Sequence, residues 1–288
     1  MGDLAQTDGV FTASAGHTIA WVRWETASPA QRLFFVHATG FCKEVWRPVI
    51  DELAERGLEF SATAIDQMGH GASTRNWDVP VDWWQNARDQ VQCADGVPFD
   101  MVIGHSSGAG NAVLAALVDP EFARRLLLIE PILLPPPYVQ DTEHPLVVGA
   151  LRRKRRFESR QAAYANFHGR GAFAGWDERV FDAYIAYGFV DQPDGSVVIA
   201  CDPKHESEFF GAAGKHGGWE RMGEVVPPVH IVAGENSDSH PPDFVELQRV
   251  RLGATSEILP GVGHLVPMEA PGVTADIVIR ELGAATAL

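Results

Sequence analysis

Short apolar segments alternate with helical segments along the first 130 residues. Continuous apolar runs of this length favour strands that are buried on both faces, and mixed β-branched and aromatic runs also favour strands. Strands are predicted over residues 17–24, 33–37, 60–65, 100–105 and 125–130. Helices with conventional start and stop residues are predicted between them, over 46–57, 79–95 and 111–119. Strands alternating with helices at this spacing indicate βαβ units, and hence an α/β fold with a mostly parallel sheet.

The alternation stops after Glu130. Residues 131–222 are rich in aromatic side chains, contain a basic segment predicted to be helical (151–167) and show no clear buried strand. The strand pattern then returns, with strands predicted over 229–234 and 255–261 and a closing helix over 271–283. We therefore predict a core formed by residues 1–130 and 223–288, interrupted by a helical cap over residues 131–222, called the cap segment below.

Composition narrows the classes of partner. The formal net charge is −15, which disfavours nucleic acid and anionic membrane surfaces. The three cysteines match no metal-site spacing and favour a reducing compartment. The first residues do not resemble a signal peptide, and no apolar stretch is long enough to insert into a membrane. We expect a cytoplasmic protein that takes a small-molecule substrate, with a homodimer left open.

A G-x-S-x-G motif places a candidate nucleophile at Ser106. The motif is weak alone, but here it follows the apolar strand 100–105 directly and precedes an apolar helix. This context is typical of a nucleophile elbow, a tight turn that lifts the serine above the sheet. The glycines are needed because neighbouring strand and helix leave no room for a Cβ atom. The alternative is an ordinary strand-to-helix turn.

A serine hydroxyl needs a base beside it, and His264 is the candidate. It lies in a glycine-rich loop, GVGH, directly after the last predicted strand. For the acid that would orient this histidine, two residues remain open. Asp238 follows the strand 229–234 and is favoured, because carboxyl ends of parallel strands gather such groups. Glu130, at the end of strand 125–130, is the alternative acid.

The oxyanion of an acyl-transfer intermediate needs two N–H donors. The residue after the nucleophile supplies one, so the backbone of Ser107 is predicted in this role. The loop HATGF after strand 33–37 supplies the second, and its position favours the N–H of Thr39. Asp66 follows strand 60–65 but precedes the serine, so a structural role is expected for it.

The basic run Arg152–Arg156 has two interpretations. It is a solvated helix face, or it grips a carboxylate or phosphate on the substrate at the mouth of the pocket. No zinc-protease, C-x-x-C or Walker motif occurs in the sequence, so neither a metal nor another cofactor is expected.

Five motifs together resemble the α/β-hydrolase superfamily: HATGF (37–41), DQMGHG (66–71), GHSSG (104–108), GENSD (234–238) and GVGH (261–264). The segment LIEPI (128–132) is similar to fungal peroxisomal lipase-like and toxin-biosynthesis hydrolases. The resemblance implies a triad of Ser106, His264 and an acid under a helical cap, and some members use a glutamate at the place of Glu130. One departure is Ala38, where the usual pattern has glycine. Serine at the elbow argues against the related dehalogenases and epoxide hydrolases, which need a carboxylate nucleophile.

The expected reaction is hydrolysis of an ester, lactone or related acyl bond in a small to medium apolar substrate. Acyl transfer, thioester cleavage and carbon–carbon hydrolysis remain alternatives with the same triad, and a ligand-binding module is a further one. Aromatic residues of the cap segment would line the pocket or form the core of the cap: Phe167, Phe173, Trp176, Tyr184, Tyr187 and Phe189.

Overall fold

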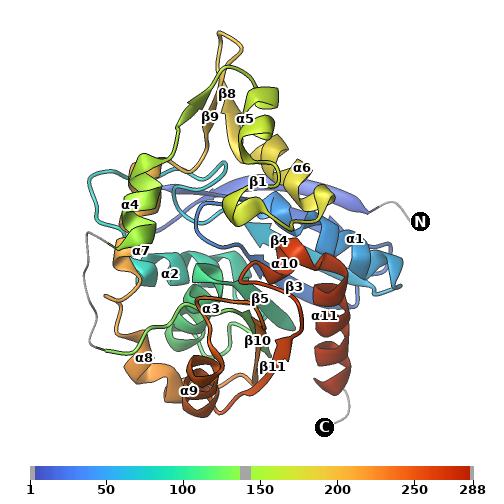
Figure 1. The fold of residues 1–288 in the computed structure, drawn as a ribbon. Helices are drawn as coiled ribbons and strands as arrows, with labels where there is room; N and C mark the ends of the chain where they lie inside the picture. The colour runs from blue at the N-terminus through green and yellow to red at the C-terminus, as the bar shows by residue number, and fades with distance from the viewer. Residues whose placement is uncertain (1–3, 137–143, 286–288) are drawn as a thin grey trace.

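A single eight-stranded sheet forms the centre of the molecule (Figure 1). The structure is a computed structural model and describes residues 4–136 and 144–285. The strand order is β1-β2-β4-β3-β5-β6-β10-β11, and all pairs from β4 to β11 are parallel. The strands are β1 (Ala5–Thr12), β2 (Thr18–Glu25), β3 (Gln31–Val36), β4 (Phe60–Ile65), β5 (Met101–His105), β6 (Leu126–Ile129), β10 (Val229–Gly234) and β11 (Thr255–Leu259).

The central strands are apolar because both of their faces are covered. β5, β6 and β10 are buried along their whole length, as continuous apolar runs require in a parallel sheet. β2 instead alternates between buried and partly exposed positions, which suits an antiparallel pair near a sheet edge. The predicted strands therefore occur, and β1, with its mostly polar sequence, is an edge strand that the apolar pattern does not predict.

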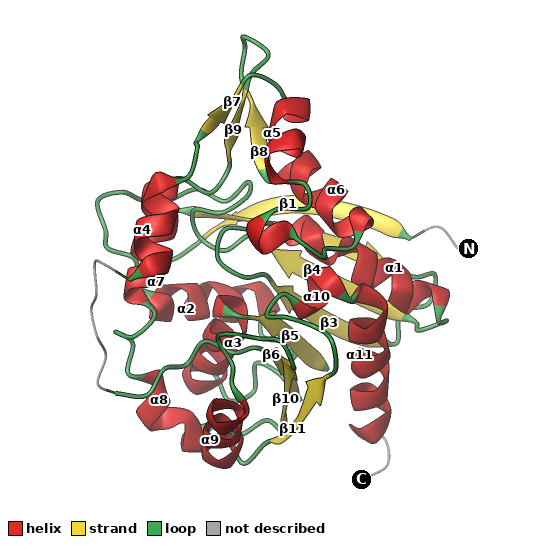
Figure 2. Cartoon of the chain, viewed as in Figure 1, coloured by secondary structure: helices red, strands yellow, loops and turns green. Residues whose placement is uncertain are grey.

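Helices cover both faces of the sheet (Figure 2). Helices α1 (Arg47–Glu55) and α11 (Pro271–Ala285) pack against each other on one side. Helices α2 (Trp83–Ala94) and α3 (Ser107–Val118) pack together on the other side. The remaining helices of the core are α9 (Pro242–Leu252) and the short α10 (Val266–Glu269). The 3-10 turn η1 (Lys43–Trp46) comes directly before α1.

The cap segment differs from the prediction in two ways. Its basic stretch is not one helix, because α4 ends at Arg152 and the chain is extended before the two residues of β7. It also contains a small antiparallel sheet, β7-β9-β8, at the top of Figure 1. The elements are α4 (Pro145–Arg152), β7 (Arg156–Phe157), α5 (Arg160–Phe167), η2 (Gly171–Phe173), α6 (Glu178–Tyr187), β8 (Phe189–Asp191), β9 (Val197–Ile199), α7 (Pro203–Ala212), α8 (Gly218–Arg221) and η3 (Met222–Glu224).

The cap segment and the sheet share one apolar core. Trp176 and Tyr184 of the cap segment belong to the same cluster of buried residues as Phe41 and Trp46 of the core. The ring of Phe41 lies 5.1 Å from that of Trp176 and 5.8 Å from that of Tyr184. The cap segment is thus packed onto the loop that follows β3, at the carboxyl end of the sheet.

Candidate active site

Ser106 occupies a strained turn between β5 and α3. Its backbone has φ 55° and ψ −117°, a region that residues other than glycine rarely adopt. A Cβ atom on Gly104 would meet Ala109 at 2.5 Å, and one on Gly108 would collide with the backbone oxygen of Val36. Both glycines are therefore required by close packing, as the motif predicts. The turn leaves Ser106 9% exposed.

His264 faces the serine from the loop after β11. Its Nε2 lies 3.2 Å from the Oγ of Ser106. Glu269 of α10 holds the loop in place, because its carboxylate accepts the N–H groups of Gly263 at 2.8 Å and Leu265 at 3.2 Å. The structure thus brings the predicted nucleophile and base within hydrogen-bonding distance, although 158 positions separate them in the sequence.

Glu130 is the carboxylate that contacts His264. Its Oε2 lies 2.8 Å from the Nδ1 of His264, and its side chain is fully buried. Gly234 donates its N–H to Oε1 at 2.7 Å, and Ser237 donates its hydroxyl to Oε2 at 2.6 Å. Burial acts to raise the pKa of Glu130, but hydrogen bonds from His240 and His264 outweigh it and lower the pKa to about 2.

The favoured acid, Asp238, does not reach the histidine. Its side chain is exposed, and within the described residues the carboxylate that meets His264 belongs to Glu130. The reason lies in the two backbones. Glu130 has φ 51°, an uncommon left-handed conformation at the end of β6, and its side chain is buried, whereas Asp238 lies on the solvent side of its loop. The geometry therefore favours Glu130, the alternative acid, over Asp238.

The loop carrying Asp238 contributes other groups, which the sequence analysis missed. Ser239 places its Oγ 2.8 Å from the Nδ1 of His264. His240 is 1% exposed, and its Nδ1 lies 2.8 Å from the Oε2 of Glu130. In the sequence, the only sign of these contacts is that Ser239 and His240 follow directly after Asp238. The pattern of residue types alone does not say which of these neighbours faces inward.

The two residues predicted to donate to the oxyanion contact each other through their side chains. The hydroxyl of Thr39 donates to the Oγ of Ser107 at 2.9 Å, which joins the loop after β3 to the start of α3. Ser107 is the first residue of α3, so its N–H has no acceptor within the helix and is available to an oxyanion. Position 38 does not require glycine, because the residue of this loop with a left-handed backbone is Gly40, at φ 86°.

Polar residues beneath this loop hold it to the sheet. Gln67 donates its N–H to the Nε2 of His37 at 3.1 Å and its side-chain amide to the carbonyl of the same residue at 2.7 Å. Asp66 is fully buried and accepts the ammonium of Lys43 at 2.8 Å. Burial raises the pKa of Asp66, and the Lys43 ammonium acts against that shift. These contacts are consistent with a structural role for Asp66.

The basic run Arg152–Arg156 is not a free anion site. Arg153 is partly buried, and one of its nitrogens lies 2.6 Å from both carboxylate oxygens of Glu206. Its other terminal nitrogen donates to the hydroxyl of Tyr184 at 2.9 Å. The other four residues of the run are exposed. Its innermost charge is thus neutralised within the cap segment, and the exposed Arg155 and Arg156 form ion pairs with Asp202 and Asp194.

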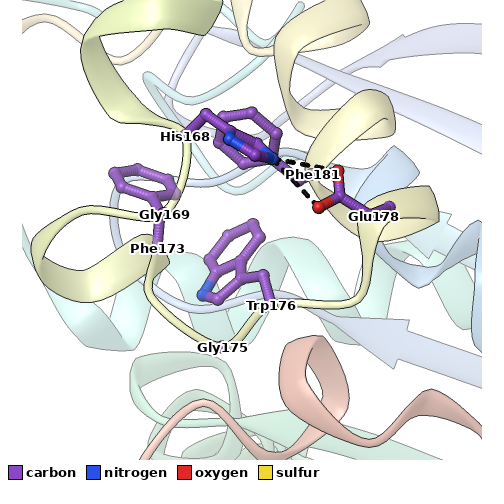
Figure 3. A pocket seen from close by; sticks show the side chains of 7 residues that line it. All are labelled: His168, Gly169, Phe173, Gly175, Trp176, Glu178 and Phe181. Atoms are coloured by element: carbon purple, nitrogen blue, oxygen red, sulfur yellow. Dashed lines mark hydrogen bonds and ion pairs between the residues drawn. The ribbon is translucent and has the colours of Figure 1, made fainter.

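One cavity of the cap segment, of about 70 Å³, is lined in part by the aromatic rings of Phe173, Trp176 and Phe181 (Figure 3). His168 and Glu178 border it and are hydrogen bonded at 2.9 Å. Trp176 lies between this cavity and Phe41. The cavity does not contain the serine or His264. It is lined by His168, Gly169, Phe173, Gly175, Trp176, Glu178 and Phe181.

Three side chains are close enough to hold a metal ion. Potential ligand atoms of Glu130, His240 and His264 all lie within 4.8 Å of one another. Hydrogen bonds of both histidines to the same carboxylate oxygen already account for this spacing. We therefore assign no metal to them.

Within the described ranges, no helix combines the length and the apolar character that a membrane span needs.

Comparison with known proteins finds a matching family model and several similar proteins. The model of the alpha/beta hydrolase family matches residues 33–277. The peroxisomal membrane protein LPX1 of Saccharomyces cerevisiae is 24% identical over 297 residues, which cover 87% of this chain and 73% of that protein. A type I acyl-CoA thioesterase of Penicillium roqueforti is 31% identical over 183 residues, 57% of this chain and 42% of the thioesterase. The chain thus spans less than half of that relative.

Solved structures support the same placement. The crystal structure of yeast Lpx1 superposes with a TM-score of 0.80 at 18% identity, covering 98% of this chain and 89% of that one. An esterase of Mycobacterium tuberculosis superposes with a TM-score of 0.77 at 21% identity, covering 98% and 93%. At these identities the likeness concerns the fold, and it confirms the fold class predicted from the sequence.

Proposed function

The chain belongs to the alpha/beta hydrolase family and is a hydrolase, and from this premise we propose that it cleaves an ester, lactone or related acyl bond through an acyl-enzyme on Ser106. One observation carries the proposal: a continuous contact from the serine through His264 to Glu130, with successive distances of 3.2 and 2.8 Å. Serine, imidazole and carboxylate in this order are the components of a nucleophilic triad.

In the proposed mechanism, His264 removes the proton of the serine hydroxyl as the oxygen attacks the substrate carbonyl. Glu130 accepts the Nδ1 proton of His264, which leaves Nε2 as the basic nitrogen and stabilises the imidazolium that forms. The backbone N–H groups of Thr39 and Ser107 receive the oxyanion. His264 then gives the proton to the leaving group. In the second half, His264 takes a proton from water as the water attacks the acyl-enzyme, and it returns that proton to the Oγ of Ser106 as the acid leaves.

Aromatic residues next to the oxyanion loop support an apolar acyl group. Phe41 follows directly on the oxyanion loop, and its ring packs edge-on against Trp176. Trp176, Phe173 and Tyr184 form an aromatic cluster in the cap segment on the same side of the sheet. Tyr187, in contrast, is 55% exposed. We also propose a reducing compartment such as the cytoplasm, which the three free cysteines favour.

The test uses a fluorophosphonate probe and a p-nitrophenyl butyrate assay. We expect the wild-type protein to be labelled and to hydrolyse the ester, and Ser106→Ala to lose labelling and about 10⁴–10⁶-fold in kcat. Ser196→Ala, in the turn between β8 and β9, is the matched control and should keep both properties. An unlabelled but folded wild-type protein would instead favour a ligand-binding module, and full activity in Ser106→Ala would remove the serine from the mechanism.

A thioesterase or acyltransferase is the second candidate function. The similarity to a type I acyl-CoA thioesterase favours a thioester over a carbon–carbon bond. Both reactions form the same acyl-enzyme, so the acceptor decides the product. Product analysis of a short-chain acyl-CoA, with and without an added alcohol, separates the two: free acid alone indicates hydrolysis, and a new ester indicates transfer.

A further inference from the structure

A chain of buried hydrogen bonds joins helix α3 to the loop that follows β3. Asn111, one turn after Ser107 in α3, donates its side-chain amide to the Oε1 of Gln67 at 2.7 Å. Gln67 in turn donates its side-chain amide to the carbonyl of His37 at 2.7 Å and its backbone N–H to the Nε2 of that ring at 3.1 Å. Asn111 and His37 are fully buried, and Gln67 is 1% exposed. These bonds link three separate segments of the chain, one of which is the loop that carries Thr39.

The ring of His37 passes this constraint to a single peptide group. Because Nε2 accepts the N–H of Gln67, the proton of the neutral ring lies on Nδ1, which donates to the carbonyl of Ala38 at 2.7 Å. Burial lowers the pKa of His37 to about 4, against the effect of the bond to Ala38 and together with the charge of Lys43, so the ring is neutral at neutral pH. The N–H of Phe41 binds the same carbonyl at 3.3 Å. The carbonyl of Ala38 is thus held by two donors.

The carbonyl of Ala38 and the N–H of Thr39 belong to the same peptide group. In a planar trans peptide the N–H points in the direction opposite to the carbonyl, so donors that hold the carbonyl also fix the direction of the N–H. The N–H of Thr39 has no acceptor within residues 4–136 and 144–285, which leaves it available to an oxyanion. The hydroxyl bond from Thr39 to Ser107 ties this peptide to the start of α3, where the second donor lies.

We propose that Gln67 is a positioning residue for the two oxyanion donors. Anchored by Asn111 of α3, it fixes the ring of His37 and, through that ring, the direction of the Thr39 N–H. The inference deepens the proposed function and rests on it, because acyl-transfer chemistry is what makes these N–H groups oxyanion donors. Both donors then belong to one hydrogen-bonded unit, although 68 positions separate them. Donors that are already oriented need no rearrangement when negative charge develops on the substrate.

Asn111 supports this interpretation because only half of its amide is used. Its Oδ1 is buried and has no hydrogen-bond partner among the described residues, which is unfavourable. Turning the amide over would bring this oxygen against the Oε1 of Gln67, which is also an acceptor, and would lose the existing bond. An apolar side chain at position 111 would avoid the unpaired oxygen. The bond to Gln67 is therefore what the asparagine contributes here.

Other polar groups around the ring of His37 do not replace Gln67. The Oδ1 of Asp66 lies 3.9 Å from Nε2, too far for a hydrogen bond, and accepts the backbone N–H of Lys43 at 2.7 Å. The ring of His70 lies 5.3 Å from that of His37, and burial lowers the pKa of His70 to about 3, so it is neutral as well. In the described part of the chain, Gln67 is the donor that holds the Nε2 of His37.

The first experiment compares Gln67→Met with the wild type in kcat, KM and inhibition by a pentyl trifluoromethyl ketone, which forms an oxyanion when it adds to Ser106. Methionine keeps the size of the side chain and the backbone N–H but removes the amide. We expect kcat for p-nitrophenyl butyrate to fall about 10- to 100-fold, somewhat less than for the loss of a whole donor, with KM within about twofold. The Ki of the ketone should rise by about the same factor as kcat falls.

Gln90→Met is the matched control, because it makes the same change at a buried glutamine of α2 whose amide has no partner among the described residues. It should leave kcat, KM and Ki unchanged. A merely structural role of Gln67 would lower the amount of active protein, and hence the apparent kcat, without weakening the inhibitor. An unchanged Ki in Gln67→Met therefore overturns the inference.

Asn111→Ala carries the same test if Gln67→Met does not fold. It removes the anchor in α3, and we expect kcat to fall and Ki to rise about three- to tenfold. The double variant should lose no more than Gln67→Met alone, because both residues act through one chain of bonds. Losses that multiply in full would contradict this shared path.

The last measurement does not depend on catalysis. The ¹⁵N relaxation of the Thr39 amide reports how firmly its N–H is oriented on the ps–ns timescale. The order parameter should be about 0.85 in the wild type and in Gln90→Met, and below about 0.7 in Gln67→Met. Equal values in all three proteins contradict the inference. If the wild type hydrolyses no ester and binds no trifluoromethyl ketone, the proposed function fails, while this comparison still decides whether Gln67 orients the loop.

Discussion

The carboxyl ends of β6 and β10 lie side by side in the sheet, and each is followed by an acidic residue. After β6, Glu130 is fully buried and contacts His264. After β10, Asp238 is exposed. Strand position alone makes the two equivalent, since both strands are parallel, adjacent and apolar. The difference lies in the path that the backbone takes directly after each strand.

Glu130 follows β6 directly and adopts a left-handed backbone at φ 51°. The chain after β10 instead runs on through a turn and supplies donors: the N–H of Gly234 and the hydroxyl of Ser237 both bind the carboxylate of Glu130. One strand end thus provides the charge, and its neighbour provides the groups that hold it. A buried carboxylate needs such donors, because burial without them disfavours the ionised form.

The largest expected effect separates the two carboxylates. Glu130→Gln keeps the shape of the side chain but removes its negative charge and replaces one acceptor oxygen by a donor. His264 then loses the charged acceptor that orients its Nδ1–H. We expect kcat for p-nitrophenyl butyrate to fall about 10³–10⁴-fold, by analogy with triads whose acid becomes an amide. Asp238→Asn should stay within about twofold of wild type, because the side chain is exposed. Equal losses in the two variants, measured in the same assay, would undo the comparison.

A smaller effect is expected from the end of β10 itself. A Cβ atom on Gly234 would collide with the backbone oxygens of Val262 and Gly263, in the loop that carries His264. Gly234→Ala should therefore lower the free energy of unfolding by about 2–4 kcal/mol. Gly211→Ala, at a position in α7 with no heavy atom within 4 Å of the new Cβ, should cost less than about 0.5 kcal/mol. Urea unfolding followed by tryptophan fluorescence measures both changes, and similar values would show that the end of β10 is not tightly packed against the loop of His264.

The smallest effect is expected from removing one hydrogen-bond donor of Glu130, the hydroxyl of Ser237. Ser237→Ala removes the hydroxyl that binds Glu130 at 2.6 Å and leaves the two histidines and the N–H of Gly234 in place. The remaining donors keep the carboxylate ionised, so we expect kcat/KM to fall only about three- to tenfold. A loss as large as that of Glu130→Gln would mean that the serine, and not the histidines, controls the acid.

Much of the fold follows from the sequence because the central strands are apolar on both faces and short. The elbow and the position of His264 also follow, since the glycines and the strand ends constrain them locally. The carboxylate that meets His264 does not follow in the same way, because its position depends on the φ angle of Glu130, which the residue type does not reveal. His240 is hidden for a similar reason: its burial results from the packing of its loop against Pro131 and Phe244.

The cap segment shows the same limit at larger scale. The sequence favours helix over residues 151–167, yet Arg153 leaves the helix to bind Glu206 and Tyr184, and the next residues pair as a strand with β9. These partners are distant in the chain, so local periodicity carries no trace of them. A polar contact between remote segments decides where the helix ends.

The apolar core that Trp176 and Tyr184 share with Phe41 and Trp46 has a consequence for engineering. The two parts of the molecule behave as one cooperative unit, because removing either would expose aromatic rings that the other covers. A shortened enzyme made by deleting residues 131–222 would therefore aggregate rather than gain a wider entrance. Broader access for bulky acyl groups is better sought by trimming individual rings than by excising the whole insertion.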